Sequence, residues 1–249
     1  MMKKIFIVSV SCMMFMLIMT ASVSAQSFDY SGSLDLAGNA DGYLTGTGTW
    51  NTGPTSIEWN VSWNGSEQYV HYSYTFTYPS HDPSYFIFEV SDNFTSSDIT
   101  NVKVDDVLLP YTVGDQTFAS EVNTFEPGSN NYQTMPESIY GVKIENPQVA
   151  DPSNGSVTIT FDSTRMPEWG DFYARCGVRT EHTEGTTEWN SAWNTGFTTS
   201  DPIVAASSGS VSNHILVPDT VVVPEPVSST LFIIGSGLFA GRRYLRRKK

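Results

Sequence analysis

Five of the six tryptophans in this chain are each followed directly by asparagine. These tryptophans are Trp50, Trp59, Trp63, Trp189 and Trp193. An indole ring can pack on the C–H face of a sugar while a neighbouring amide hydrogen-bonds the sugar hydroxyls. The same residues can also serve as core aromatics followed by turn residues, so the pattern leaves carbohydrate binding and core packing as alternatives.

The surroundings of each tryptophan separate these alternatives. Trp59 and Trp63 fall on the apolar face of a predicted hairpin, which favours the core. The segments around Trp169, Trp189 and Trp193 have a loop-like composition. We therefore predict that these three are the candidates for glycan contacts.

Metal-ligating residue types are present, but their spacing matches no known motif. Acids cluster at Asp35–Asp41, at Asp105–Asp106 and at Glu168–Asp171, and none of the clusters follows the EF-hand pattern. The four histidines are not arranged as pairs, and they are His71, His81, His182 and His214. We predict no zinc site, no assigned metal ligands and no cofactor, while the acidic composition remains compatible with a structural Ca²⁺.

Signatures of the common enzyme classes are missing from the sequence. It contains no Gly-x-Ser-x-Gly elbow, phosphate-binding loop or dinucleotide fingerprint. A glycosidase needs two carboxylates about 5–10 Å apart, a distance that sequence spacing does not reveal. We predict a non-catalytic protein and keep a polysaccharide-active enzyme as an alternative, with Glu168–Tyr173 as its candidate segment.

Between its two ends the chain alternates apolar and polar residues with a period of two, which predicts strands. Asn64-Gly65 suits the positive φ angles of a two-residue hairpin turn, which would set Trp63 opposite Ser66 and Ile57 opposite Tyr72. One face of this hairpin is apolar and the other polar, so we expect the first face to be buried.

Further segments are also rich in apolar residues and bounded by turn residues, so we predict an all-β protein. We predict strands at Tyr85–Val90, Asn101–Leu109, Ile139–Ile144, Val157–Phe161 and Phe172–Val178, with a last edge strand at His214–Val217. Many short strands joined by polar loops predict an antiparallel β-sandwich, jelly-roll-like or similar. Cys176 shares the apolar face of its strand, so it is expected to be a core residue.

The N-terminus has the three parts of a secretory signal peptide. Lys3 and Lys4 precede the apolar segment Ile5–Met19, and the small residues Val23-Ser24-Ala25 follow. Cleavage is expected after Ala25. The predicted organisation is a signal peptide at 1–25, an ectodomain at 26–217 and a linker at 218–223.

The C-terminus carries a short apolar stretch between a proline motif and a basic cluster. Pro224-Glu225-Pro226 is followed by 15 residues, 227–241, which as a helix would span about 22 Å against about 30 Å of hydrocarbon. The basic cluster contains Arg242, Arg243, Arg246 and Arg247. Basic residues beside an apolar helix stay in the cytoplasm, which predicts that the ectodomain lies outside.

This three-part order resembles the PEP-CTERM sorting signal over residues 224–249. The resemblance implies export by the Sec machinery and cleavage near Pro224-Glu225-Pro226 by an exosortase, in a Gram-negative bacterium that makes exopolysaccharide. It also implies that the C-terminal helix is only transiently in the membrane. The mature chain would then lie at the cell surface or in the extracellular matrix.

Removal of both ends makes the charge of the chain more negative. Five Lys and Arg residues remain against 26 Asp and Glu, a formal net charge near −21. Such a surface repels nucleic acid, so we expect no DNA or RNA partner. The sequence predicts an exported, non-catalytic matrix protein associated with exopolysaccharide or biofilm, with a carbohydrate-binding module as the alternative.

Overall fold

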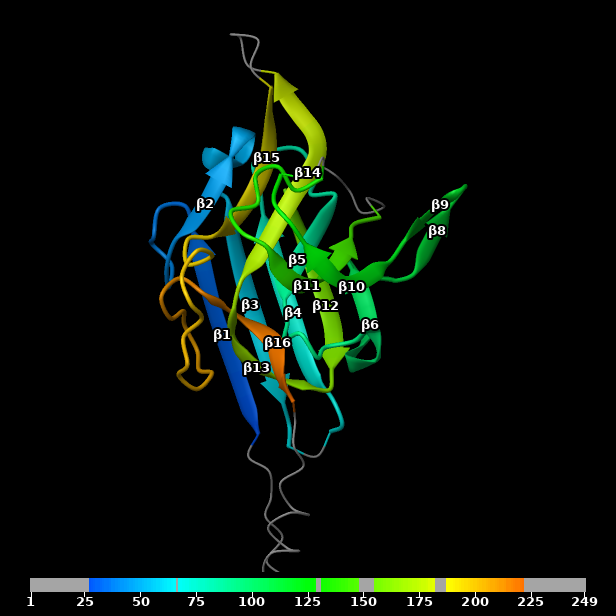
Figure 1. Cartoon of the computed structure of the whole chain (residues 1–249), viewed down its shortest axis with the longest axis vertical. Coiled ribbons are helices and arrows are strands. Elements are labelled where there is room, and N and C mark those ends of the chain that lie inside the picture. The colour runs from blue at the N-terminus through cyan, green and yellow to red at the C-terminus, as the bar shows by residue number, and fades with distance from the viewer. Residues whose placement is uncertain (1–26, 66, 129–130, 148–154, 182–186, 222–249) are drawn as a thin grey trace, which may run out of the picture. The chain divides into compact units, whose positions relative to one another are not determined.

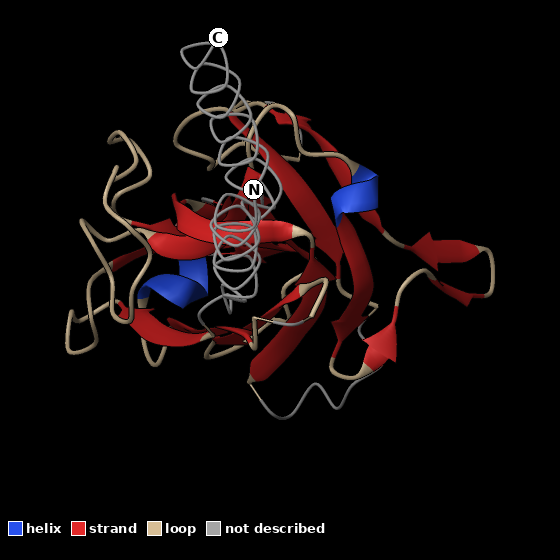
Figure 2. Ribbon diagram, turned by 90° about the horizontal axis from the view of Figure 1, so that it is seen from below, coloured by secondary structure: helices blue, strands red, loops and turns tan. Residues whose placement is uncertain are grey.

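The computed structural model of this chain describes residues 27–65, 67–128, 131–147, 155–181 and 187–221. Strands dominate these residues, and the helical content consists of the short 3-10 turns η1 (Gly48–Asn51) and η2 (Ser96–Asp98) (Figure 2). Within the described residues, no helix is long and apolar enough to cross a bilayer. The predicted signal peptide and sorting tail lie outside the described residues.

Two six-stranded sheets form the framework of the fold (Figure 1). The first sheet has the order β1 (Phe28–Asp35), β3 (Ser56–Trp63), β4 (Val70–Thr77), β12 (Ser156–Ser163), β6 (Ile99–Val104) and β7 (Val107–Leu108). The second has the order β10 (Ser120–Phe125), β11 (Ile139–Glu145), β5 (Tyr85–Glu89), β14 (Phe172–Glu181), β15 (Thr187–Asn194) and β2 (Leu44–Thr47). Neighbouring strands in both sheets run antiparallel.

Two smaller antiparallel pairs complete the described strands. They are the pair β13 (Arg165–Gly170) with β16 (Ile215–Val221), and the pair β8 (Tyr111–Val113) with β9 (Gln116–Phe118). The second pair projects from the side of the sandwich in Figure 1.

Aromatic side chains fill the space between the two large sheets. The ring of Tyr74 in β4 stacks on that of Phe88 in β5 at 4.2 Å between centroids, and Phe76 meets Phe86 edge-on. Trp50 in η1 is fully buried and donates its indole N–H to the Ser80 carbonyl. Because the two sheets share this core, the prediction of an antiparallel β-sandwich is confirmed.

The predicted hairpin has the right faces but the wrong register. Ile57 is buried as expected, yet it pairs with Phe76 rather than with Tyr72, a shift of four residues. The connection is therefore longer than two residues, and in it Asn64 accepts a hydrogen bond from the Glu67 N–H at 3.0 Å. An even shift keeps every side chain on its face, so alternation alone could not detect it.

The other predicted strands are found, with one division. β5 lies in the middle of its sheet, which explains why it is apolar and buried at nearly every residue. The predicted strand Asn101–Leu109 is wrong in its middle, because Asp105 and Asp106 adopt positive φ angles of 46° and 64° and form the turn between β6 and β7. Cys176 is 1% exposed, which confirms its place in the core.

The last strand extends further than the sequence suggested. β16 continues to Val221, and Pro218 and Thr220 pair with Pro167 and Met166 of β13. Residues 218–221 therefore belong to the sheet and not to a linker. The domain boundary predicted at residue 217 is corrected, and the compact unit runs from Ser27 to Val222.

Candidate functional site

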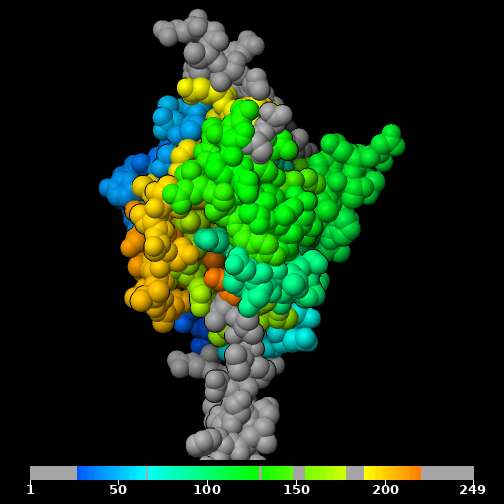
Figure 3. Space-filling view, in the orientation of Figure 1, coloured from blue at the N-terminus to red at the C-terminus, as the bar shows by residue number. Residues whose placement is uncertain are grey.

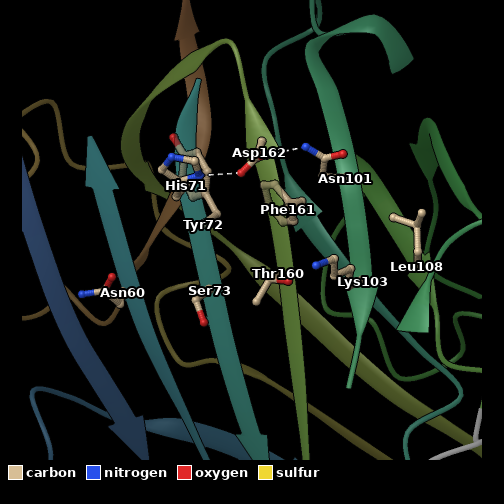
Figure 4. Close-up of a pocket in the computed structure, with 10 residues that line it drawn as sticks. All are labelled: Asn60, His71, Tyr72, Ser73, Asn101, Lys103, Leu108, Thr160, Phe161 and Asp162. Carbon is tan, nitrogen blue, oxygen red and sulfur yellow. Dashed lines mark hydrogen bonds and ion pairs between the residues drawn. The ribbon is translucent and has the colours of Figure 1, made fainter. Parts of the chain in front are cut away.

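An open groove lies on the outer face of the first sheet, across β3, β4, β12, β6 and β7 (Figure 4). It has a volume of about 470 Å³. The polar side chains that line it are Asn60, His71, Ser73, Asn101, Lys103, Thr160 and Asp162. We call this feature the His71 groove.

Strand alternation explains why polar groups gather in this groove. In β4 the buried Tyr72 and Tyr74 point into the core, so His71 points outward. In β12 the buried Phe161 likewise leaves Asp162 on the outer face. The register pairs Asp162 directly with His71, which places the two polar side chains next to each other.

Asp162 organises the groove through two short hydrogen bonds. One carboxylate oxygen lies 2.6 Å from His71 Nδ1, and the other accepts the Asn101 amide N–H at 2.6 Å. Both contacts are drawn in Figure 4. Asn101 has a positive φ of 52°, a conformation that asparagine tolerates better than most residues, and it lies opposite the register shift of β12. These bonds hold three hydrogen-bonding groups in a defined arrangement.

The His71 ring lies between two carboxylates. Its Nε2 atom lies 2.8 Å from Glu67 Oε2, opposite the contact with Asp162. Partial burial lowers the pKa of His71, but the hydrogen bonds to Asp162 and Glu67 and their negative charges outweigh it, so the pKa is raised above its ordinary value. The ring therefore keeps its proton to a higher pH than an ordinary histidine.

A second groove of about 480 Å³ adjoins the first and shares His71. Its lining includes the half-buried rings of Phe28 and Trp63, whose centroids are 5.9 Å apart. The Trp63 indole N–H donates to the Glu67 carbonyl, which fixes the ring plane. The two grooves thus combine aromatic surface with fixed hydrogen-bonding groups, a combination that suits a neutral sugar chain.

Trp169 does not occupy a loop, contrary to the sequence analysis. It lies in β13, is 2% exposed and belongs to the main core. A ring enclosed in this way cannot contact a glycan, so its prediction as a glycan contact is wrong. Nearby Glu168 is exposed while Asp171 is buried, so the two acids of the candidate segment lie in different environments.

Trp189 and Trp193 lie on β15 in the second sheet, rather than on loops. Both rings are partly exposed. The Arg175 guanidinium lies 3.9 Å from the centroid of the Trp189 ring, and Trp193 stacks with Tyr173 at 6.4 Å. The structure does not bring either residue to the His71 groove, and their role as glycan contacts stays a prediction.

Comparison with known proteins gives little further information. No family model matches the chain, and no curated protein matches it. Among solved structures, the chain is similar to the KRT10-binding region domain of the pneumococcal serine rich repeat protein PsrP. The alignment has 15% identity, covers 61% of this chain and 84% of the other, and has a TM-score of 0.20, so it carries no argument about function.

Proposed function

We propose that this chain is an exported, non-catalytic surface protein that is sorted through its Pro-Glu-Pro tail and associates with extracellular polysaccharide. The observation that carries the proposal is the position of the folded unit. Ser27–Val222 lies entirely between the expected leader cleavage after Ala25 and the motif that begins at Pro224. Cleavage at both sites would remove no residue of either sheet.

Charge supports the same proposal. Residues 26–226, which cleavage beside the proline motif would leave, carry a formal net charge near −21, from five basic and 26 acidic residues. A strongly acidic domain stays soluble outside the cell and is repelled by anionic polymers. A neutral polysaccharide is therefore the partner that the domain's charge tolerates best.

Mass spectrometry of the mature protein from the producing bacterium tests the delivery proposal. We expect an N-terminus at Gln26 and a C-terminus near Pro224-Glu225-Pro226, without the cluster Arg242–Arg247. Cells that lack the exosortase provide the control, in which the tail should remain attached. Surface-located protein that keeps an intact tail through Lys249 in normal cells would contradict sorting by cleavage.

The arrangement of the His71 groove and the adjoining groove favours a second candidate function, direct carbohydrate binding. Asn101→Gly removes the amide but retains a residue that accepts the positive φ, and Trp63→Ala removes the aromatic surface. Loss of one hydrogen bond to a charged network costs about 1.5 kcal/mol or more, and loss of an aromatic contact costs about 0.5–1.5 kcal/mol beyond the area that it buries. Each change should therefore weaken binding of neutral polysaccharide by up to about tenfold. Affinity measured on a glycan array and by calorimetry checks this result.

Asn123→Ala is the matched control for this experiment, because Asn123 is an exposed asparagine on β10 of the other sheet. It should leave polysaccharide affinity unchanged. Binding that survives both changes at full strength would rule out the two adjoining grooves as the binding site.

A further inference from the structure

Three metal-ligating side chains from distant parts of the sequence meet beside β16. They are Asp171, which precedes β14, Asp201, and His214, which precedes β16. One donor atom of each, the carboxylate oxygens and an imidazole nitrogen, lies within 4.8 Å of the other two. Asp201 and His214 belong to the segment 195–214, coloured yellow to orange, which covers one flank of the sandwich in Figure 3.

The His214 side chain is fully buried and aims its Nε2 atom into this cluster. Nε2 has no hydrogen-bond partner among the described residues, although it lies 3.5 Å from Asp171 Oδ1 and 3.5 Å from Asp201 Oδ1. These separations are longer than the usual 2.7–3.2 Å of an N–H···O bond. A bound cation between these groups would satisfy a buried imidazole nitrogen that faces two carboxylates without a hydrogen bond.

Two of the three ligand separations are close to those around a tetrahedral zinc ion, and the third is no longer than 4.8 Å. Ligands at about 2.0–2.1 Å from such an ion lie about 3.3–3.4 Å from one another. The observed 3.5 Å from Nε2 to each carboxylate oxygen is close to that value. One nitrogen and two oxygen ligands also form a set that zinc accepts, whereas calcium and magnesium prefer oxygen alone.

The surroundings of the cluster orient its ligands. The other ring nitrogen of His214, Nδ1, lies 3.3 Å from the Val211 carbonyl, which leaves the Nε2 lone pair directed at the cluster in the neutral ring. Asp171 Oδ1 accepts the Asn194 amide N–H at 2.6 Å, and Asn194 in turn accepts the Phe172 N–H. Such outer partners are typical of bound metals because they hold the ligands in place.

Close packing and access complete the site. A side chain at Gly196 would place its Cβ 2.7 Å from the His214 ring, so only glycine leaves room for the imidazole. The Asp201 side chain is 45% exposed, which gives an ion a route from solvent. We infer that Asp171, Asp201 and His214 form a zinc-binding site that lies apart from the His71 groove, with the fourth position open to water or another ligand.

Zinc binding by the full chain tests this inference. After dialysis with Zn²⁺, we expect about one retained equivalent by elemental analysis and a rise in melting temperature that Ca²⁺ and Mg²⁺ do not produce. Asp201→Asn should weaken zinc binding by about 100-fold while the protein stays folded, because this side chain is half exposed and the change preserves its shape. His214→Ala should abolish zinc binding. If the His214→Ala protein does not fold, Asp201→Asn still tests the inference.

His71→Ala is the matched control, because His71 also lies between two carboxylates but belongs to the other site. It should retain zinc like the unchanged protein. Zinc affinity that is unchanged in Asp201→Asn would overturn the inference. If the protein retained no zinc, the cluster would be only an ion pair, and the inference would be overturned. A thermal response to Ca²⁺ instead of Zn²⁺ would overturn it as well, because the site would not be a zinc site.

Discussion

Replacement of Asp98 by alanine should lower the free energy of unfolding by about 3–5 kcal/mol, because it leaves the buried Arg165 charge without its partner. The Arg165 side chain is 7% exposed, and its guanidinium contacts both oxygens of Asp98, at 3.1 and 3.2 Å. It also donates to the side chain and the carbonyl of Asn93. Urea unfolding followed by fluorescence measures the loss.

Two further variants identify the cause of that loss. Asp92→Ala removes an exposed acid from the same connection and should change stability by less than about 0.5 kcal/mol. Asp98→Ala combined with Arg165→Met removes both charges, so it should be more stable than Asp98→Ala alone. If Asp98→Ala alone were as stable as the unchanged protein, the ion pair between Asp98 and Arg165 would contribute nothing to the free energy of unfolding.

Acid titration provides a second measurement of the same pair. Burial raises the pKa of Asp98, but hydrogen bonds from Arg165, Thr95 and Thr164 outweigh it and lower the pKa to about 2. A pKa that is lower in the folded state contributes stability above the unfolded value of about 3.9, and this contribution is lost as pH falls towards 2. The Asp98→Ala variant should therefore lose less stability than the unchanged protein between about pH 4 and pH 2.

Replacement of Trp169 by alanine should also destabilise the domain by about 3–5 kcal/mol, through the cavity that it leaves. The indole is 2% exposed within the main core, and its N–H has no hydrogen-bond partner among the described residues. The loss therefore reflects packing rather than a broken hydrogen bond. Thermal and urea unfolding of the variant measure it.

Trp169→Phe and Trp189→Ala are the controls for this prediction. Phenylalanine fills most of the space, so Trp169→Phe should cost less than Trp169→Ala. Trp189 is only partly buried, so its loss should be milder as well. A Trp169→Ala protein of unchanged stability that no longer bound glycan would restore the role that the sequence first suggested.

Alternation predicted the faces of the strands but not their partners. Trp59 and Val61 could be assigned to the core because inward and outward positions differ in polarity along the strand. The register predicted from Asn64-Gly65 was wrong, because a pair of residues that favours a tight turn does not require the chain to reverse there. In the longer connection the Asn64 side chain instead accepts a hydrogen bond from the Glu67 N–H.

Local composition also misled the assignment of β13. Pro167 and Gly170 are typical of loops, yet Pro167 lies opposite Pro218 at a register shift between β13 and β16. Proline is tolerated at such a bulge because the ladder is already interrupted there. Sequence reasoning therefore placed Trp169 at the surface when it lies in a strand.

The candidate sites were beyond prediction because their residues are distant in sequence. His71 and Asp162 meet through the order of β4 and β12, and that order has no local signal. His214 likewise reaches Asp171 and Asp201 through the fold, so a search for short metal-binding motifs could not detect the cluster. The polar face of β4 could be predicted from the sequence, and it indicated an exposed surface. It did not indicate which strands lie beside β4.

The place of β16 at the C-terminal end of the folded unit affects when the core can close. Ile215, Leu216 and Val217 are fully buried, and the Leu216 carbonyl accepts the hydroxyl hydrogen of Tyr74 from the middle of the first sheet. A chain that crosses a membrane with its N-terminus first delivers these residues last. Under the proposed export the core would close only after residues 215–217 emerge, and a chain truncated before residue 215 would leave apolar core surface uncovered.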